Sequence, residues 1–136
     1  PQQAAKLKII KAHYESLESR KAELEELILA LAAPYQQEFA ILQTAPGISS
    51  NFTAIGIISE IGTNMEAFPS AKHLCSWAGL TPTNNESAGK KKSVRVSKAG
   101  CYIKPLLVQC ANAVIKSTKH PEMRNRYLRL KKRRGH

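Results

Sequence analysis

The residues best suited to do chemistry in this chain surround Ser87. Ser87 is followed by two small residues, Ala88 and Gly89, and then by three lysines: Lys90, Lys91 and Lys92. Small neighbours allow a bulky phosphate to approach a hydroxyl, and ammonium groups supply the positive charge that a phosphate needs. The stretch therefore predicts that Ser87 contacts a nucleic-acid phosphate. The same composition is also typical of a solvated loop whose serine only caps a turn, and composition alone favours that second interpretation.

A serine hydroxyl is a weak nucleophile until a base or a charged neighbour activates it. The chain contains no Asp, so a Ser–His–Asp triad is excluded. Cations can instead stabilise the negative charge that builds up on a phosphodiester under attack. The cations that the stretch supplies are Lys90, Lys91, Lys92, Arg95 and Lys98. Ser93 and Ser97 are rival nucleophiles, and both are less favoured because bulkier residues flank them.

Positive charge is concentrated in the C-terminal part of the chain. Residues 87–136 hold fifteen Lys and Arg residues against Glu122 alone, and the whole chain has a formal net charge of +11. A positive region of this density indicates a polyanionic partner. Nucleic acid fits better than a membrane, because no long apolar run or lipidation signal accompanies the charge. On the last expected helix, the residues assigned to a nucleic-acid backbone are Arg126, Arg129 and Lys132.

The sequence offers no metal site. A two-metal phosphoryl-transfer site normally needs several carboxylates, and the Glu residues of this chain are mostly spread along one helix. The three cysteines, Cys75, Cys101 and Cys110, lack CxxC spacing and form no zinc-type pattern with the histidines. We therefore expect no cofactor in this chain and free thiols in a reducing cytoplasm. Any metal-dependent step would need carboxylates from elsewhere.

Residues 4–32 are expected to form one long helix with an apolar seam. In heptads counted from Leu7, apolar residues fill every seam position except one. The a positions are Leu7, Tyr14, Lys21 and Ile28. The d positions are Ile10, Leu17, Leu24 and Leu31. This pattern predicts a coiled coil that joins copies of the chain into a homo-oligomer, while packing of the helix on its own domain is the alternative.

Two helices around a tight turn are expected in residues 35–62. The turn lies at residues 46–48, and a polar residue at 50 or 51 can cap the second helix. This arrangement is similar to a helix-hairpin-helix motif, in which turn amides and the next helix N-terminus hold a DNA phosphate. Gly47 and Ser49 are the phosphate-binding candidates, with Ser49 where the motif usually has its second glycine. A plain helical hairpin is the alternative.

Beyond this turn, the chain is expected to be helical except around Ser87. Alternation of apolar and polar residues over residues 93–97 predicts a short strand or hairpin arm within residues 83–97. The single tryptophan, Trp77, is expected to pack in the core rather than to stack on a base. The helices are expected at residues 68–79, 102–118 and 121–133.

The fold class is therefore mainly α, with two domains. Residues 1–33 are expected to form a long coiled-coil helix that acts as a dimerisation arm. Residues 34–136 are expected to form a small helical domain with the helix-hairpin-helix-like motif and a short β-hairpin or loop that carries the serine. At 136 residues, the chain is long enough to bury one modest core.

Several short motifs together resemble those of a known family. They are PGI at 46–48, AFPSAKHLCSWAGLTP at 67–82, ESAGK at 86–90 and SKAG at 97–100, ahead of a basic tail. This order resembles the C-terminal transposase domain of insertion-sequence-110/116/902-type transposases, from about residue 41 to the C-terminus. The family's catalytic serine precedes a Gly-Gly-Lys-like run. The matching position in this sequence is Ser87, with Ala88 in place of the first glycine.

The resemblance implies a serine nucleophile that attacks DNA and forms a covalent phosphoserine link during insertion-sequence transposition. It also implies a separate N-terminal resolvase-like domain that supplies acidic residues and a divalent metal, expected to be magnesium. A structured guide RNA and a helical dimerisation arm are further implied features. The chain is then expected to bind DNA without cleaving it alone, at the nucleoid in the cytoplasm of a bacterium or archaeon.

Two other functions stay open at this point. A non-catalytic helix-hairpin-helix module, dimerised by its coil, would give Ser87 no role in any reaction and would bind phosphate around Gly47. A purely structural coiled-coil scaffold would explain residues 4–32 and leave the basic half of the chain without a purpose.

Overall fold

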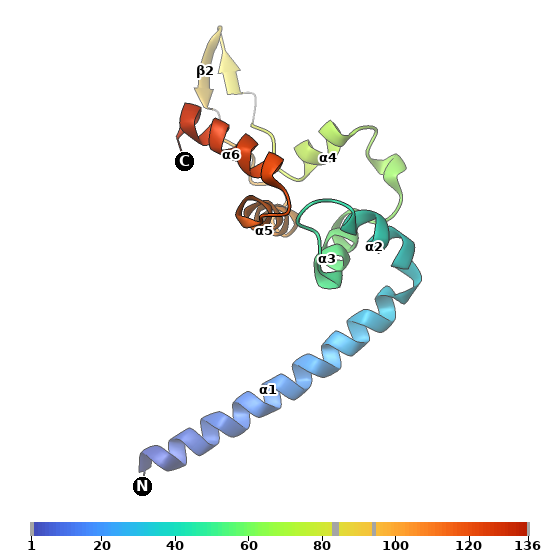
Figure 1. Cartoon of the computed structure of the whole chain (residues 1–136), viewed down its shortest axis with the longest axis vertical. Coiled ribbons are helices and arrows are strands. Elements are labelled where there is room, and N and C mark those ends of the chain that lie inside the picture. Colours follow the sequence, from blue (N-terminus) through green and yellow to red (C-terminus); the bar gives the residue numbers. More distant parts are fainter. Residues whose placement is uncertain (1, 83–84, 94, 136) are drawn as a thin grey trace. The chain divides into compact units, whose positions relative to one another are not determined.

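The computed structural model of the chain describes residues 2–82, 85–93 and 95–135. Within them the fold is mainly helical, as expected (Figure 1). The helices are α1 (Gln2–Ala32), α2 (Gln36–Gln43), α3 (Asn51–Ile61), α4 (Ala71–Trp77), α5 (Ile103–Lys116) and α6 (Pro121–Arg134), with 3₁₀ turns at Ala33–Tyr35 and Met65–Ala67. The two strands are β1 (Asn85–Ser87) and β2 (Lys90–Ser93).

The chain divides into two compact units, Pro1–Gln36 and Gln37–His136. The first unit consists almost wholly of α1, which has no Pro or Gly to interrupt it. Two exposed ion pairs span successive turns of this helix, with 3.7 Å between the charged atoms of Lys11 and Glu15 and of Lys21 and Glu25. Such pairs add only a few tenths of a kcal/mol each. Ala32 is the one buried residue in the described part of α1, so the predicted apolar seam is exposed.

α5 is the central helix of the second unit. Its residues Ile103, Cys110 and Val114 are buried, at spacings of seven and four residues that keep them on one face of the helix. α3 packs against α5 and buries Ala54 and Ile57. α6 packs against α5 as well. The core of this unit is therefore a small set of apolar faces gathered around one helix.

The turn between α2 and α3 packs directly on α5. Gly47 has φ +92°, a conformation that L side chains rarely adopt. A Cβ added there would lie 2.5 Å from Cγ2 of Val114 and 2.6 Å from the carbonyl oxygen of Cys110. Both the backbone conformation and the close approach to α5 therefore require glycine at this position.

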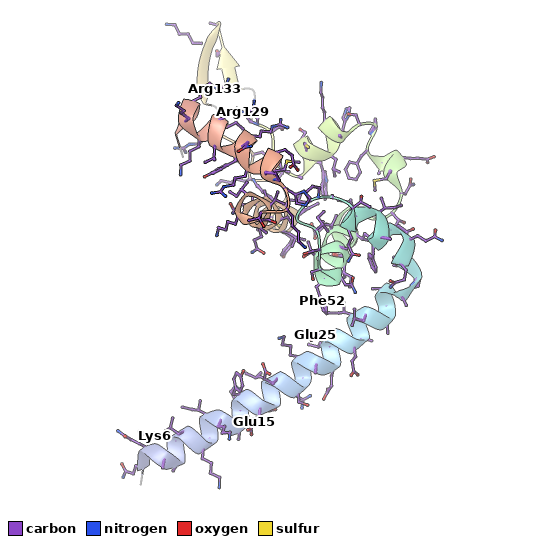
Figure 2. All side chains as sticks on the ribbon, in the orientation of Figure 1. Lys6, Glu15, Glu25, Phe52, Arg129 and Arg133 are labelled. Carbon is purple, nitrogen blue, oxygen red and sulfur yellow. The ribbon has the colours of Figure 1, made fainter. Side chains whose placement is uncertain are left out.

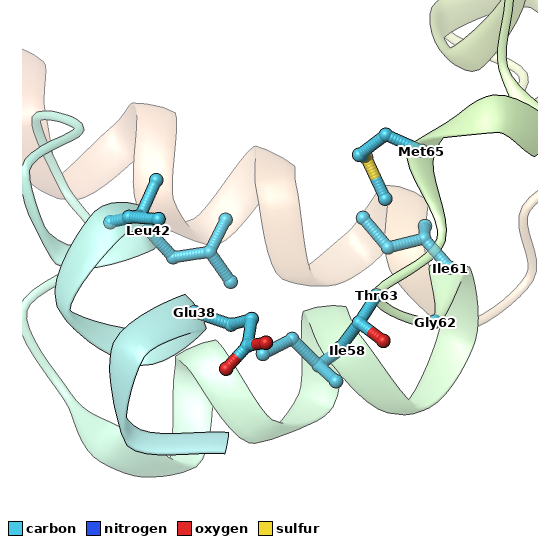
Figure 3. A pocket seen from close by; sticks show the side chains of 8 residues that line it. Glu38, Leu42, Ile58, Ile61, Gly62, Thr63 and Met65 are labelled. Carbon is cyan, nitrogen blue, oxygen red and sulfur yellow. The ribbon is translucent and has the colours of Figure 1, made fainter.

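A shallow hollow lies between α2 and α3 on the other side of this turn. Figure 3 shows the side chains around it: Leu42 from α2, Ile58 and Ile61 from α3, and Met65 beyond α3. Its volume is about 200 Å³. Its one charged residue is the acidic Glu38. An apolar wall with a carboxylate on it is unsuited to a nucleic-acid phosphate.

β1 and β2 form an antiparallel hairpin, so the expected hairpin in residues 83–97 is present. Ser87 pairs with Lys90, and the two residues between them, 88 and 89, make the turn. An isolated bridge links Pro82 to Val96 below the strands.

The strand boundaries differ from the alternation that predicted them. β2 ends at Ser93, and beyond it Val96 joins only the isolated bridge. Val94 lies outside the described residues. The sequence of β2, KKKS, carries no apolar alternation, which is why its position could not be read from the pattern.

Two details of α4 also differ from expectation. Trp77 was predicted to pack in the core, and 45% of its surface is exposed. Its ring touches Phe68 edge-on, with 5.6 Å between the ring centroids, so the contact covers only part of the indole. Ser70 holds the expected N-cap position without a side-chain bond to the backbone, because its hydroxyl lies 2.8 Å from Nδ1 of His73.

Candidate nucleic-acid interface

Ser87 lies at the end of β1, next to the turn of the hairpin, and it is exposed. Residues paired across an antiparallel ladder project their side chains from the same face. The pairing of Ser87 with Lys90 therefore places an exposed ammonium group on the face of the hairpin that carries the hydroxyl. The backbone of Lys91 and Lys92 continues β2, and their side chains lie outside the described part of the structure.

The turn at Ala88-Gly89 leaves space beside the hydroxyl. Ala88 has φ +52° and Gly89 has φ +74°. Two successive positive φ values are typical of a type I′ turn, the form that fits a two-residue hairpin. A Cβ added to Gly89 would have no atom within 4 Å, so the tip of the hairpin is open to a bulky ligand. Ala88, which is not glycine, nevertheless adopts the left-handed conformation.

The base of the hairpin is fixed to the helices by close contacts. A Cβ added to Gly79, at the end of α4, would lie 2.5 Å from the carbonyl oxygen of Ala99. From α5, the ammonium group of Lys104 donates a hydrogen bond of 2.5 Å to the carbonyl oxygen of Ser97. The Ser97 hydroxyl in turn accepts a hydrogen bond from the backbone N–H of Ala99 at 3.3 Å. Ser97 therefore stabilises the base of the hairpin through these hydrogen bonds. This structural role distinguishes Ser97 from Ser87.

The other cations of the stretch lie around this base. Lys98 is exposed, and Arg95 is exposed and takes part in an interaction of its own. The hairpin thus presents its hydroxyl and Lys90 near the tip, with Arg95 and Lys98 farther back along the returning chain.

On α6, three arginines share one face, and two of them, Arg129 and Arg133, are labelled in Figure 2. Arg126, Arg129 and Arg133 recur at steps of three and four residues and line a hollow of about 340 Å³. Lys132 was predicted from the sequence in place of Arg133. Lys132 does not line this hollow, because it comes six residues after Arg126 and is turned about 120° from it, whereas Arg133 comes seven residues after Arg126 and lies within about 20° of it. The helical spacing from Arg126 would have identified Arg133.

The arginine face borders the apolar face that binds α6 to α5. Met123, Tyr127 and Leu130 line a groove with Leu107 and Val114 of α5, and Arg126 lies at its edge. On the opposite edge, Nζ of Lys131 lies 5.9 Å from the centre of the Tyr127 ring. Packing on α5 therefore fixes the direction of the arginine face.

The α2–α3 turn forms a second hollow with the α5–α6 turn. Gly47 and Ser49 line it together with Ser117, Lys119 and His120, and its volume is about 230 Å³. Gly47 and Ser49 were predicted from the sequence, whereas Lys119 and His120 were missed because they come from a distant part of the chain. Ser50 holds the N-cap position of α3 without a side-chain hydrogen bond. α2 and α3 are the expected pair of helices around the turn, and both the helix-hairpin-helix motif and its phosphate-binding role stay predictions.

Burial raises the pKa of the Cys110 thiol, and this thiol lies in the core, away from the hairpin. Among the described residues, no three His, Cys, Asp or Glu side chains lie together as metal ligands. No helix there is both long and apolar enough to span a lipid bilayer.

Arginines clustered along one face of a helix, in a chain of net charge +11, are typical of a protein that binds nucleic acid. A model of the Transposase IS116/IS110/IS902 family matches residues 39–128 of the chain. The chain therefore belongs to this transposase family, as the short motifs indicated. No curated protein and no solved structure matches it.

Proposed function

We propose that this chain is the serine-bearing, DNA-binding part of a transposase that cuts and joins DNA, with Ser87 as the nucleophile. The observation that carries the proposal is the exposed Ser87 hydroxyl beside an open two-residue turn, with Lys90 as its cross-strand partner. Family membership supports the reaction class. A core position or a bulky neighbour at residue 88 or 89 would have removed the space that a DNA strand needs.

The proposed reaction exchanges one phosphate ester for another. The Ser87 oxygen bonds to the phosphorus of a DNA phosphodiester, the serine proton passes to a base, and the bond to one deoxyribose oxygen breaks. That oxygen leaves with a proton as a free hydroxyl. Lys90 would stabilise the charge on the non-bridging oxygens. Because the phosphoserine ester keeps the energy of the original bond, attack by another DNA hydroxyl can reverse the step and join strands.

The remaining parts of the site are proposed to come from outside this chain. The sequence contains no Asp, so carboxylates that bind a divalent metal, expected to be magnesium, would belong to a resolvase-like domain of the longer protein. A structured guide RNA would select the DNA sites. The enzyme would act at the nucleoid in the cytoplasm of a bacterium or archaeon, and it would self-associate through α1.

The proposal is tested by trapping the covalent intermediate. In the transposase that carries both domains, Ser87→Ala should abolish covalent protein–DNA adducts on a nicked substrate that cannot be rejoined. DNA affinity, measured by fluorescence anisotropy at one salt concentration, should change by at most about tenfold, because the exposed hydroxyl makes at most one hydrogen bond to a phosphate, on the order of 1 kcal/mol.

Ser97→Ala is the matched control. It removes a hydroxyl from the same loop, and it should retain adduct formation because Ser97 bonds to the backbone of Ala99. Adducts that persist in the Ser87→Ala variant would exclude Ser87 as the nucleophile.

The hollow beside Gly47 supports a second candidate, a non-catalytic phosphate-binding module. Lys119 lines this hollow together with Ser49, which lies two residues before α3. Gly47 itself is unsuited to a test, because any side chain there would clash with α5. Lys119→Gln should weaken DNA binding if the hollow holds a phosphate. If only this substitution affected the full protein and Ser87→Ala left adducts intact, the binding module would be the better description.

A further inference from the structure

α1 exposes a continuous apolar surface that nothing in its own unit covers. The leucines along its seam are more than half exposed: Leu7 65%, Leu17 54%, Leu24 58% and Leu31 68%. A solvated helix of this length would normally present a polar surface all round. A seam that repeats every three and four residues fits another helix with the same repeat. The repeat itself leaves the relative direction of the two helices open.

Charge is divided unequally between the two halves of α1. Residues 2–14 carry Lys6, Lys8 and Lys11 and no acidic residue. Residues 15–32 carry five Glu residues against Arg20 and Lys21. Figure 2 shows this polarity, with Lys6 near the N-terminal end and Glu15 and Glu25 farther along the helix. In a parallel pair each half would face a half of the same sign. In an antiparallel pair each half faces the opposite sign.

Lys21, the lysine in the seam, gives a second and independent reason to expect antiparallel pairing. In a parallel, in-register pair the two Lys21 side chains would meet in one layer of the interface. Antiparallel pairing with full overlap of the seam places Leu7 opposite Leu31 and Lys21 opposite Leu17. The two Lys21 residues are then four positions apart, about 6 Å along the axis. Each ammonium group also reaches Glu18 of the partner subunit, which adjoins Leu17 at the seam.

The residues that flank the seam contribute contacts of both signs in either direction. Lys11 and Glu25 both hold e positions, and in an antiparallel pair e positions face each other across the interface. In the register that the seam sets, Lys11 of one copy faces Glu25 of the partner subunit, and the pair occurs twice. In the same antiparallel register Glu18 faces Glu18 of the partner subunit and Arg20 faces Arg20 of the partner subunit, once each. In a parallel pair, Lys6 would face Lys11 of the partner subunit, whereas Arg20 would face Glu25 of the partner subunit.

We infer that α1 pairs with α1 of a second copy in the antiparallel direction, with Leu17 opposite Lys21. The inference rests on the proposed self-association through α1 and adds its direction and register. It attaches the two serine-bearing units at opposite ends of the paired helices. The 31 residues of α1 correspond to about 46 Å of helix, so the two units of one dimer join the pair at points about that far apart.

Pulsed electron–electron resonance on the full chain measures the direction. A single spin label is placed at Ala5→Cys, an exposed position on the outer side of the helix, after Cys75→Ser, Cys101→Ser and Cys110→Ala. Antiparallel pairing should separate the two labels by about 42 Å along the axis, the rise of 28 residues. Parallel pairing should bring them to about 20 Å, the width of two helices.

Ser19→Cys in the same background is the control. It lies on the outer side of the helix, level with the midpoint of the seam, so the two labels sit at one level in either direction and should give about 20 Å in both. A long distance at position 5 with a short one at position 19 supports the inference. Short distances at both positions overturn it and leave self-association standing. Absence of any dipolar signal at both positions overturns self-association as well.

Charge reversal gives an orthogonal measurement. Replacing Lys6, Lys8 and Lys11 by Glu turns two attractive contacts into repulsive ones in the antiparallel pair. In the parallel pair it replaces the repulsion between Lys6 and Lys11 of the partner subunit by a repulsion between two glutamates. The dimer dissociation constant, from analytical ultracentrifugation at low salt, should rise at least tenfold. The same charge change in the second unit, at Lys72, Lys116 and Arg124, should leave it unchanged. An unchanged constant in the α1 variant would overturn the antiparallel direction.

Discussion

Among single residues, Ala88 holds a conformation that its side chain opposes. Its φ of +52° lies in the left-handed region, where the Cβ of an L residue costs roughly 1–2 kcal/mol. The family's Gly-Gly-Lys-like run has glycine at this position, and the structure shows what a glycine would do there. It would allow the turn without strain.

Ala88→Gly should therefore stabilise the hairpin by roughly 1 kcal/mol, since the strain disappears and only part of the gain is offset by the greater freedom of the unfolded chain. Hydrogen exchange of the hairpin amides should slow about fivefold. Ala88→Val should have the opposite effect and destabilise the hairpin, because a β-branched residue fits positive φ worse than alanine. Faster exchange in the glycine variant would show that the turn does not adopt this form in solution.

Gly47 and Gly62 allow two reasons for a glycine to be tested separately: a positive φ and a lack of space for a Cβ atom. Both have positive φ, +92° and +70°, but a Cβ at Gly62 would have no atom within 4 Å. Gly47→Ala should therefore lower the free energy of unfolding by roughly 1–3 kcal/mol more than Gly62→Ala, because it adds overpacking against α5 to the backbone strain. Urea denaturation of the full chain measures both. Equal destabilisation would mean that the turn moves away from α5 at little cost.

Among the elements, α6 is the clearest test of nucleic-acid binding. Replacing Arg126, Arg129 and Arg133 by Gln removes the face that lines one hollow. The slope of log affinity for duplex DNA against log salt should become less steep by about 0.9 for each phosphate that the variant no longer neutralises. Fluorescence anisotropy titrations between 50 and 200 mM salt, roughly the range in which such slopes are resolved, provide the measurement.

A variant of equal charge change controls for the general decrease in positive field. Arg124, Lys131 and Lys132 belong to the same helix, away from the arginine-lined hollow. Their replacement by Gln should alter the slope less. Equal slopes for the two variants would mean that α6 attracts DNA as a diffuse charge, with no preferred face.

The elements could be predicted from the sequence to different degrees. Helical periodicity predicted α1, α5 and α6 within a few residues, because each buries or presents an apolar stripe that repeats every three or four residues. The hairpin was expected, but its second strand was misplaced, since an exposed strand such as Lys90–Ser93 has no buried face to impose alternation. Trp77 was wrongly assigned to the core because residue type alone does not report how many neighbours a short helix has.

The candidate site shows the same limit. Ser87 and its lysines are consecutive in the chain, so local sequence was enough to name them. Lys119 and His120 join Gly47 only through the packing of α3 on α5, which no local pattern contains. Residue types and local sequence were therefore enough to propose Ser87 and its lysines. The residues that tertiary packing brings next to Gly47 could not be predicted in that way.

In the molecule as a whole, the two units contribute different physics. The first is one helix with an exposed apolar seam, so burial of that seam against a partner would stabilise it. The second buries its own core around α5. Binding of DNA by two linked units is stronger than by one, since the second contact becomes intramolecular. If two copies pair through α1 as proposed, the direction of that pairing decides whether the second units of the two copies meet one DNA segment or two.

The hairpin is fixed to the helices at its base, by the close contacts of Gly79, Ala99 and Lys104. Residues at its tip can therefore be exchanged without disturbing the buried faces that keep the protein folded. Over generations, new reactive groups could be tried at that tip while thermal stability stayed constant. The fold thus leaves its chemistry unusually free to diversify.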